Sequence, residues 1–115
     1  MPVENLARSD VVTASTETSI GELASTMDDA DVGSVVIVDG ETPRGIVTDR
    51  DLTVRVLAEE DDASDLDAED VMSSDLCTIE SGSGFYQATQ LMAEHDVRRL
   101  PVCDADGTLV GVITV

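Results

Sequence analysis

The sequence contains no lysine and no tryptophan, and it has one phenylalanine, one tyrosine and one histidine. With so few aromatic side chains, the core must be built from Val, Ile, Leu, Ala and Met, and the hydrophobic fraction of 42% is large enough for one. No hydrophobic run reaches the roughly 20 residues of a membrane-spanning helix, and residues 1–10 lack the apolar stretch of a signal peptide. We therefore expect a cytoplasmic protein without a membrane partner.

Positive charge is also scarce. Six Arg residues stand against 25 acidic residues, which gives a net charge of −19. Such a chain repels the phosphate backbone of nucleic acids, so nucleic acid is excluded as a general partner. Repulsion among the acids destabilises the compact state at low salt. Together with the absence of lysine, this charge predicts a halophilic, salt-adapted protein, and an ordinary acidic protein is the alternative.

Cysteine and histidine are too few to indicate chemistry. Cys77 and Cys103 cannot form a disulfide scaffold, and neither has a Cys or His at metal-ligand spacing. We expect two buried thiols that act as small hydrophobes, with redox or metal chemistry as the alternative. His95 lacks a Ser or Cys nucleophile at a recognisable spacing, so we expect it on the surface or as an outer contact to a phosphate. The sequence thus predicts no catalytic residue, no metal site and no enzyme.

An internal repeat organises the chain. The two halves of the sequence align with each other at an offset of 65 residues. One extra residue in the second turn changes the offset to 66 for the last matching segment. The matches keep their order and spacing, so the chain is a duplication with repeats at 1–58 and 67–115 around an acidic linker at 59–66. The matching segments are Val11–Thr13 with Leu76–Thr78, Met27 with Met92, Asp31-Val32 with Asp96-Val97, Ile37–Asp39 with Val102–Asp104, and Gly45–Thr48 with Gly111–Thr114.

Both repeats predict the same order of elements. A short strand precedes a helix, which in the first repeat has the Ser19/Glu22 signature of a capping box, and the helices end near Asp31 and Asp96. A buried β-branched strand, a turn and an antiparallel partner follow. The predicted fold is α+β, with tandem β-α-β-β-α repeats packed about a pseudo-two-fold axis and a ligand cleft where the repeats meet. The expected strands are 11–14, 34–38, 45–48, 76–79, 100–103 and 109–114, and the expected connecting helices are 51–58 and 67–72.

The ordered motifs resemble those of a CBS (cystathionine-β-synthase) domain pair, or Bateman module. They are Asp31–Asp39 with Gly45–Asp51 in the first copy, and His95–Val102 with Gly111–Thr114 in the second. The resemblance covers nearly the whole chain. It implies a stand-alone CBS-domain protein, a homodimer that binds an adenosine ligand and signals to a regulated partner whose identity the sequence does not give. The alternative is a ligand-independent dimerisation or assembly module with a vestigial site.

The resemblance also implies one composite nucleotide site. In it, Thr48 and Asp51 hold the ribose, and Leu76 and Cys77 flank the adenine. The chemistry fits, because a carboxylate accepts hydrogen bonds from both ribose hydroxyls. The alternative is that Thr48 is only a helix N-cap and Asp51 only a first-turn acid.

The phosphate contacts implied by the resemblance are Arg98 and Arg99. Guanidinium groups suit phosphate, and they favour AMP, ADP or ATP over S-adenosylmethionine. The alternative is that the pair only balances acids such as Asp96. The matching positions in the first repeat, Gly33 and Ser34, carry no charge, and the second ribose acid and final helix would lie beyond residue 115. We therefore expect one competent site, and the sequence does not say whether the chain is whole or part of a longer one.

Overall fold

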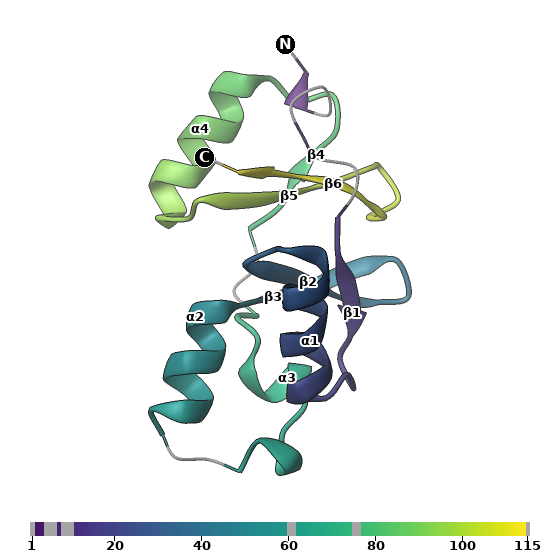
Figure 1. Cartoon of the computed structure of the whole chain (residues 1–115). Helices are drawn as coiled ribbons and strands as arrows, with labels where there is room; N and C mark the ends of the chain where they lie inside the picture. The colour runs from purple at the N-terminus through teal and green to yellow at the C-terminus, as the bar shows by residue number, and fades with distance from the viewer. Residues whose placement is uncertain (1, 4–6, 8–10, 60–61, 75–76, 115) are drawn as a thin grey trace. The chain divides into compact units, whose positions relative to one another are not determined.

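The computed structural model describes residues 2–3, 7, 11–59, 62–74 and 77–114 (Figure 1). The chain divides into two compact units. The first-sheet unit comprises residues 12–40 and 44–76, and the second-sheet unit comprises residues 1–11, 41–43 and 77–115. Each unit holds one three-stranded sheet and a hydrophobic core of its own. Mixed helices and strands in this arrangement confirm the α+β prediction.

The first-sheet unit is built around strands in the order β1-β2-β3. Strand β1 runs parallel to β2, with Thr13 opposite Val36. Only two residues connect β2 to β3, a connection that joins antiparallel strands. The elements are β1 (Thr13–Ser15), α1 (Ile20–Ala30), β2 (Ser34–Asp39), β3 (Thr42–Thr48), α2 (Asp49–Leu52), the π-helical turn η2 (Thr53–Leu57), the 3-10 turn η3 (Ala63–Asp65) and α3 (Ala68–Val71).

The second-sheet unit repeats this order. Strand β4 runs parallel to β5, and β5 runs antiparallel to β6. The register of β5 and β6 shifts between Val102 and Cys103, in the same hairpin as the extra residue that changes the sequence offset to 66. The elements are β4 (Ile79–Glu80), α4 (Phe85–His95), β5 (Arg99–Cys103) and β6 (Leu109–Thr114).

The caps of the two long helices follow the sequence signals in part. The Ser19 side chain accepts a hydrogen bond from the Glu22 N–H at 3.2 Å. The predicted capping box is incomplete, because the return bond from the Ser19 N–H to the Glu22 side chain is not among those formed by the described residues. Asp31 and Asp96 end the helices in the left-handed conformation, at φ 54° and 52°, as predicted.

Aliphatic residues and methionine fill both cores, as the lack of aromatic residues predicts. Phe85 and Tyr86 are exposed on α4. The core of the first-sheet unit is Ile20, Leu23, Met27, Val35, Ile37, Val47, Val56, Ala68 and Val71. The core of the second-sheet unit is Val3, Ile79, Ala88, Met92, Leu100, Val102 and Ile113.

Several predicted boundaries were wrong. Strand β1 begins at Thr13 rather than Val11, because its pairing with β2 covers only three residues. Strand β3 begins at Thr42, so Pro43 lies in a strand end rather than in the predicted turn. Strand β4 begins at Ile79, and the predicted start at Leu76 lies outside the described residues. The helix predicted over 51–58 consists of α2 followed by the π turn η2.

The first residues of each repeat pair with backbone that belongs to the other repeat. Pro2 pairs with Gly84, and the Val3 N–H donates to the Ser83 carbonyl at 2.8 Å. The same pattern occurs 65 residues later: Asp67 pairs with Ser19, and the Ala68 N–H donates to the Thr18 carbonyl at 2.8 Å. We call residues 2–3 and 67–68 the leading segments. Each packs in the compact unit that contains the sheet of the other repeat.

The acidic linker is partly structured. Within the described residues 62–65, the Asp62 side chain accepts hydrogen bonds from the Ser64 hydroxyl at 2.7 Å and from the Ser64 N–H at 3.0 Å. These bonds hold the pKa of Asp62 below its usual range. Asp62 thus caps η3, in a segment for which the sequence predicted only an acidic linker.

Candidate functional site

Thr48 and Asp51 form a reciprocal capping box at the start of α2. The Thr48 side-chain oxygen accepts from the Asp51 N–H at 3.0 Å, and the Asp51 Oδ2 accepts from the Thr48 N–H at 2.9 Å. The motif arises because Thr48 ends β3 in an extended conformation and the chain turns at once into the helix. Both side chains therefore have the structural role that the sequence offered as the alternative to ribose binding.

The capping box leaves both groups able to bind a ligand. A carboxylate offers about four lone-pair positions, and the Thr48 N–H occupies one of them. The Thr48 hydroxyl accepts in the box, so its own proton is available to a ligand oxygen. The Asp51 side chain is 16% exposed, enough for solvent to reach it. The box therefore fixes the two side chains in a defined orientation without using all of their capacity.

Sequence reasoning missed Arg55, which lies beside Asp51. The Arg55 Nε lies 3.8 Å from the Asp51 Oδ1. The signal was present in the sequence, because residues four apart on a helix are neighbours and an acid followed by Arg at that spacing forms an ion pair. Arg55 thus belongs to the immediate surroundings of the predicted ribose acid.

Arg98 and Arg99 lie at the start of β5. Arg98 is exposed and Arg99 is half-buried, with its backbone paired to Thr114. Neither guanidinium group forms an ion pair or a side-chain hydrogen bond with another described residue. Within the described part of the chain, no acid therefore pairs with Arg98 or Arg99, Asp96 included.

Of the predicted adenine contacts, Leu76 lies outside the described residues. Cys77 is half-buried and packs against the second core. Burial raises the pKa of its thiol, and Glu94 raises it further, so Cys77 is a neutral, weakly polar surface at neutral pH. Such a surface suits contact with a flat, apolar ring.

The predicted site residues fall into two groups. Thr48 and Asp51 belong to the first-sheet unit, whereas Cys77, Arg98 and Arg99 belong to the second-sheet unit. Within its own unit, each group has the geometry described above. The composite site that joins them stays a prediction.

The remaining sulfur and imidazole groups behave as the sequence suggested. Cys103 is buried, and burial together with Asp104 raises the pKa of its thiol. His95 is exposed at the last position of α4. Among the described residues, no group of three or more His, Cys, Asp or Glu side chains is arranged to hold a metal ion.

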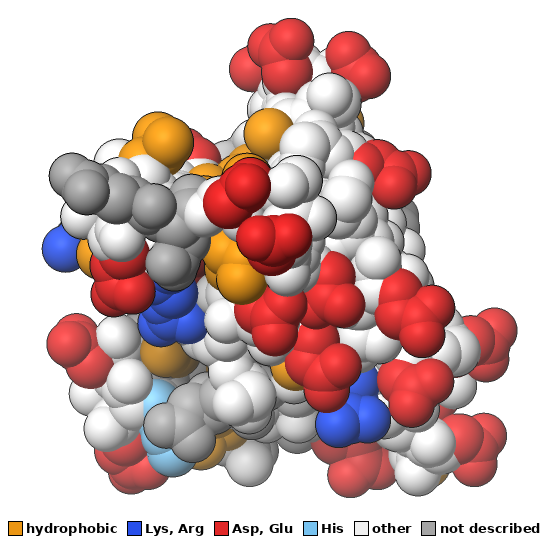
Figure 2. Space-filling model, turned by 90° about the horizontal axis from the view of Figure 1, so that it is seen from below, with side chains coloured by type: hydrophobic (Ala, Val, Ile, Leu, Met, Phe, Trp, Pro, Cys, Tyr) orange, Lys and Arg blue, Asp and Glu red, His pale blue; other side chains and the backbone are white. Residues whose placement is uncertain are grey.

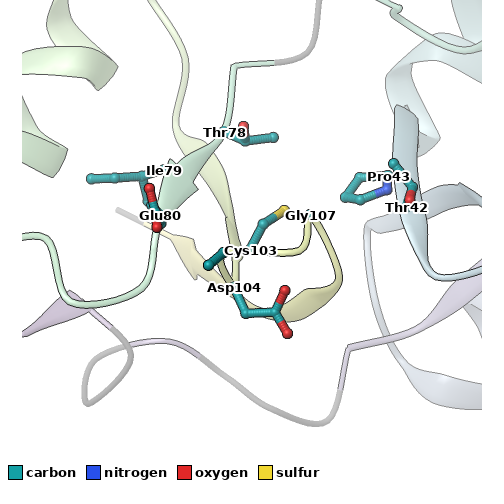
Figure 3. Close-up of a pocket in the computed structure, with 9 residues that line it drawn as sticks. Thr42, Pro43, Thr78, Ile79, Glu80, Cys103, Asp104 and Gly107 are labelled. Atoms are coloured by element: carbon teal, nitrogen blue, oxygen red, sulfur yellow. The ribbon is translucent and has the colours of Figure 1, made fainter.

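A separate pocket of about 310 Å³ lies in the second-sheet unit (Figure 3). Figure 3 shows Cys103 between the β4 residues Ile79 and Glu80 on one side and Pro43 on the other. The lining residues are Thr42, Pro43, Thr78, Ile79, Glu80, Cys103, Asp104, Ala105 and Gly107. None of the predicted nucleotide contacts is among them.

Acidic side chains dominate the surface. The face shown in Figure 2 carries many Asp and Glu side chains and few Arg side chains. In contrast to this acidic surface, the exposed Arg98 and its neighbour Arg99 carry positive charge. None of the described helices is both long and apolar enough to span a bilayer.

The comparison with protein families decides what this arrangement is. The family model for the CBS domain matches residues 3–58 and 68–115. The chain belongs to the CBS-domain family. Both repeats are matched, so the chain carries a CBS pair, as the motifs predicted.

Three similar proteins place this CBS pair among its relatives. It is 39% identical over 115 residues to an uncharacterized protein of Methanopyrus kandleri, covering 98% of this chain and 58% of that protein. A solved structure of a CBS domain protein from Pyrobaculum aerophilum complexed with AMP is 25% identical, with a TM-score of 0.88, and the match covers 99% of this chain and 87% of the other. The chain thus spans little more than half of the Methanopyrus relative but most of the Pyrobaculum structure.

The third relative is an enzyme that contains a similar segment. The chain is 31% identical over 109 residues to inosine-5'-monophosphate dehydrogenase of Halobacterium salinarum, which covers 94% of this chain but only 21% of the dehydrogenase. The match is therefore confined to the CBS part of that enzyme. What this chain shares with the dehydrogenase is therefore a CBS pair.

Proposed function

We propose that this CBS pair is a regulatory module that binds one adenine nucleotide (AMP, ADP or ATP) and signals its occupancy to a partner. The observation that carries the proposal is the pair Arg98 and Arg99, two adjacent guanidinium groups without a partner among the described residues in a chain of net charge −19. The AMP complex of the similar Pyrobaculum protein supports the class of ligand.

The ribose half of the proposed site is the capping box. Asp51 accepts hydrogen bonds from the ribose hydroxyls through the lone pairs that Thr48 leaves free, and the Thr48 hydroxyl donates its proton to the ligand. A hydrogen bond to a charged acceptor contributes about 1.5–3 kcal/mol, so Asp51 is the larger contributor of the two.

The base and phosphate halves come from the other compact unit. Cys77, together with Leu76, flanks the adenine, and Arg98 and Arg99 bind the phosphate groups. Gly33 and Ser34, which match the two arginines in the first repeat, offer no charge for a second phosphate. We therefore propose one nucleotide per chain.

Signalling follows from a change in the relative populations of alternative arrangements of the repeats. A nucleotide favours the arrangement of the repeats that it binds best, by as much as its affinities for the alternative arrangements differ. In the proposed homodimer, a partner protein binds one arrangement more tightly than the other and so responds to nucleotide concentration.

A second function is favoured by one observation. The capping box alone accounts for Thr48 and Asp51, as it would in an assembly module that binds no ligand. In an assembly module, Asp51 serves only to cap α2. In a nucleotide-binding module, Asp51 also binds the ligand.

Calorimetric titration with AMP, ADP, ATP, S-adenosylmethionine and NAD at high KCl separates the two functions. Asp51→Asn keeps an amide oxygen that accepts from the Thr48 N–H but removes the charge, so nucleotide affinity should fall about 10- to 100-fold. Arg99→Ala should abolish the preference for phosphorylated ligands.

Asp70 provides the matched control. Asp67 and Asp70 form the same reciprocal box at the start of α3, with the Asp67 N–H donating to the Asp70 Oδ2 at 2.9 Å. Asp70→Asn should therefore change stability as Asp51→Asn does while leaving nucleotide affinity unchanged. If the folded native chain binds no member of the panel, the nucleotide function is wrong and the assembly function is favoured.

A further inference from the structure

Arg55 uses every nitrogen of its guanidinium group within the first-sheet unit. The Nη1 donates to the Val71 carbonyl at 2.9 Å and to the Met72 carbonyl at 3.2 Å. The Nη2 donates to the Ser73 hydroxyl at 3.3 Å, and the Nε faces the Asp51 Oδ1 at 3.8 Å. One side chain therefore joins the proposed ribose acid to the backbone of Val71 and Met72 and to the Ser73 hydroxyl, sixteen to eighteen positions beyond Arg55.

Residues 71–73, which we call the tether, are held from a second side by β3. The Ser73 N–H donates to the Ile46 carbonyl at 2.9 Å, and the Ile46 N–H donates to the Ser73 carbonyl at 3.2 Å. A Cβ on Gly45 would lie 2.7 Å from the Met72 Sδ and 2.8 Å from the Ser73 carbonyl oxygen. The tether thus packs directly against the strand that ends at Thr48.

The tether is followed closely by the proposed adenine contacts. Leu76 and Cys77 come three and four residues after Ser73. A short stretch of backbone limits how far its two ends can separate, at most about 3.3–3.6 Å per residue. Only a short stretch of chain therefore separates the tether from the proposed adenine contacts.

We propose that Arg55 is a positioning residue, which holds the Asp51 carboxylate for the ribose and couples its occupancy to the tether. The inference rests on the proposed nucleotide function and adds a residue that the sequence motifs did not include. Asp51 is fixed on one oxygen by the Thr48 N–H and on the other by Arg55, so its free lone pairs face a defined direction. When ribose hydroxyls bind there, the carboxylate, Arg55 and the tether are immobilised together.

Lysine could not replace Arg55 in this role. The tether carbonyls at the end of α3 have no partner within the helix, and the Arg55 Nη1 donates to both of them while the Nε faces Asp51. An ammonium group is a single point of charge and lacks this fork. Arg55→Lys therefore keeps the charge but loses the link between the two groups.

The first measurement is AMP or ATP affinity by calorimetry in native, Asp51→Asn, Arg55→Met and Asp51→Asn/Arg55→Met chains. We expect Arg55→Met to weaken binding about 10-fold, and Arg55→Lys to restore only part of the loss. Because Arg55 acts through Asp51, the double variant should bind no more weakly than Asp51→Asn alone. Losses that multiply in the double variant would overturn the proposal, since a merely structural role adds to the effect of Asp51.

The second measurement is hydrogen exchange at the Met72 and Ser73 amides, which donate to Ala68 and Ile46. Nucleotide should slow exchange at both amides in the native chain and leave it unchanged in Arg55→Met. A response in Arg55→Met equal to that of the native chain would overturn the proposed coupling.

Arg44→Met is the control for the loss of one positive charge. Arg44 is exposed and pairs only with Asp39 at 3.4 Å among the described residues, so its replacement should leave affinity and exchange as in the native chain. The two proposals fail in different ways. If the native chain binds no nucleotide, both are wrong, whereas native binding that depends on Asp51 and not on Arg55 overturns only the positioning role.

Discussion

Gly45 lies where strand β3 approaches the tether most closely. The motif that begins at Gly45 contains the proposed ribose contacts Thr48 and Asp51, but the glycine itself has a packing role. Its missing side chain leaves room for the Met72 sulfur and the Ser73 carbonyl. The residue therefore prepares the site indirectly, by letting the tether lie against the strand that carries Thr48.

Gly45→Ala should destabilise the chain by about 1–3 kcal/mol, because the added Cβ would overpack a buried contact that includes rigid backbone. Gly21→Ala is the matched control. Gly21 lies in α1, where an added methyl group would meet nothing within 4 Å outside the backbone of its own helix, so alanine there should stabilise the helix by about 0.5–1 kcal/mol. Urea unfolding at high KCl measures both changes, and equal effects would contradict the close approach at Gly45.

A second prediction at the scale of single residues concerns the buried Cys103 thiol, which makes the free energy of unfolding depend on pH. Its pKa is raised above the ordinary value of 9.0 by burial first and by Asp104 second. The folded chain thus holds the thiol proton more tightly than the unfolded chain, so this contribution to stability is complete below pH 9.0 and is lost as the pH rises through the folded pKa.

In Cys103→Ala, the unfolding free energy should therefore decline less steeply above pH 9.0 than in the native chain. The cavity left by the smaller side chain lowers stability at every pH and does not affect the slope. Urea unfolding from about pH 7 to about pH 10 gives both slopes. Equal slopes would show that the thiol ionises as freely in the folded chain as in the unfolded one.

At the scale of elements, helix ends and strand order were predictable from local signals. Asp31 and Asp96 stop α1 and α4 where the repeat placed them, because Asp tolerates the left-handed conformation that ends a helix. The match between halves also predicted two copies of the same order of elements. These features depend on residues near one another in sequence, which is why the sequence alone indicated them.

The elements that were missed depend on contacts between distant residues. The Arg55 side chain contacts a tether sixteen or more positions away, and no local pattern indicates that contact. Strand β1 begins later than its apolar residues suggest because β2 sets the register. The site residues were predicted by motif, and the capping box that orients Thr48 and Asp51 was foreseen only as an alternative to binding.

The N-terminal leading segment gives a prediction at this scale. Val3 is fully buried in the second core, although it is far in sequence from the strands and helix around it. Val3→Ala should cost about 2 kcal/mol through lost burial and the cavity that remains. Hydrogen exchange should become faster in β5 and β6. Val54→Ala, at a residue 46% exposed, is the control and should change little; a similar cost for both variants would contradict the packing of the leading segment.

For the whole molecule, charge sets the conditions under which the fold is stable. A net charge of −19 on 115 residues implies repulsion that salt screens, with a Debye length of about 10 Å at 0.1 M and about 3 Å at 1 M. We predict that the unfolding free energy rises between about 0.1 M and about 2 M KCl.

A variant with Asp28, Asp29, Glu69 and Glu94 changed to amides should depend less on salt. All four side chains are exposed, so the change removes charge without disturbing a core. Thermal unfolding across the KCl series measures the two slopes. Full stability of the native chain in dilute buffer would contradict the halophilic prediction.

The exchanged leading segments bear on how such a chain could arise. A single repeat standing alone would leave the backbone that receives a leading segment unpaired and its own first residues unpartnered, and a second copy could supply what each lacks. Two separate copies would have to meet by diffusion, whereas fusion into one chain makes the exchange intramolecular and independent of concentration. Gene duplication and fusion would in this way replace two single-repeat chains that must associate with one chain that contains both repeats.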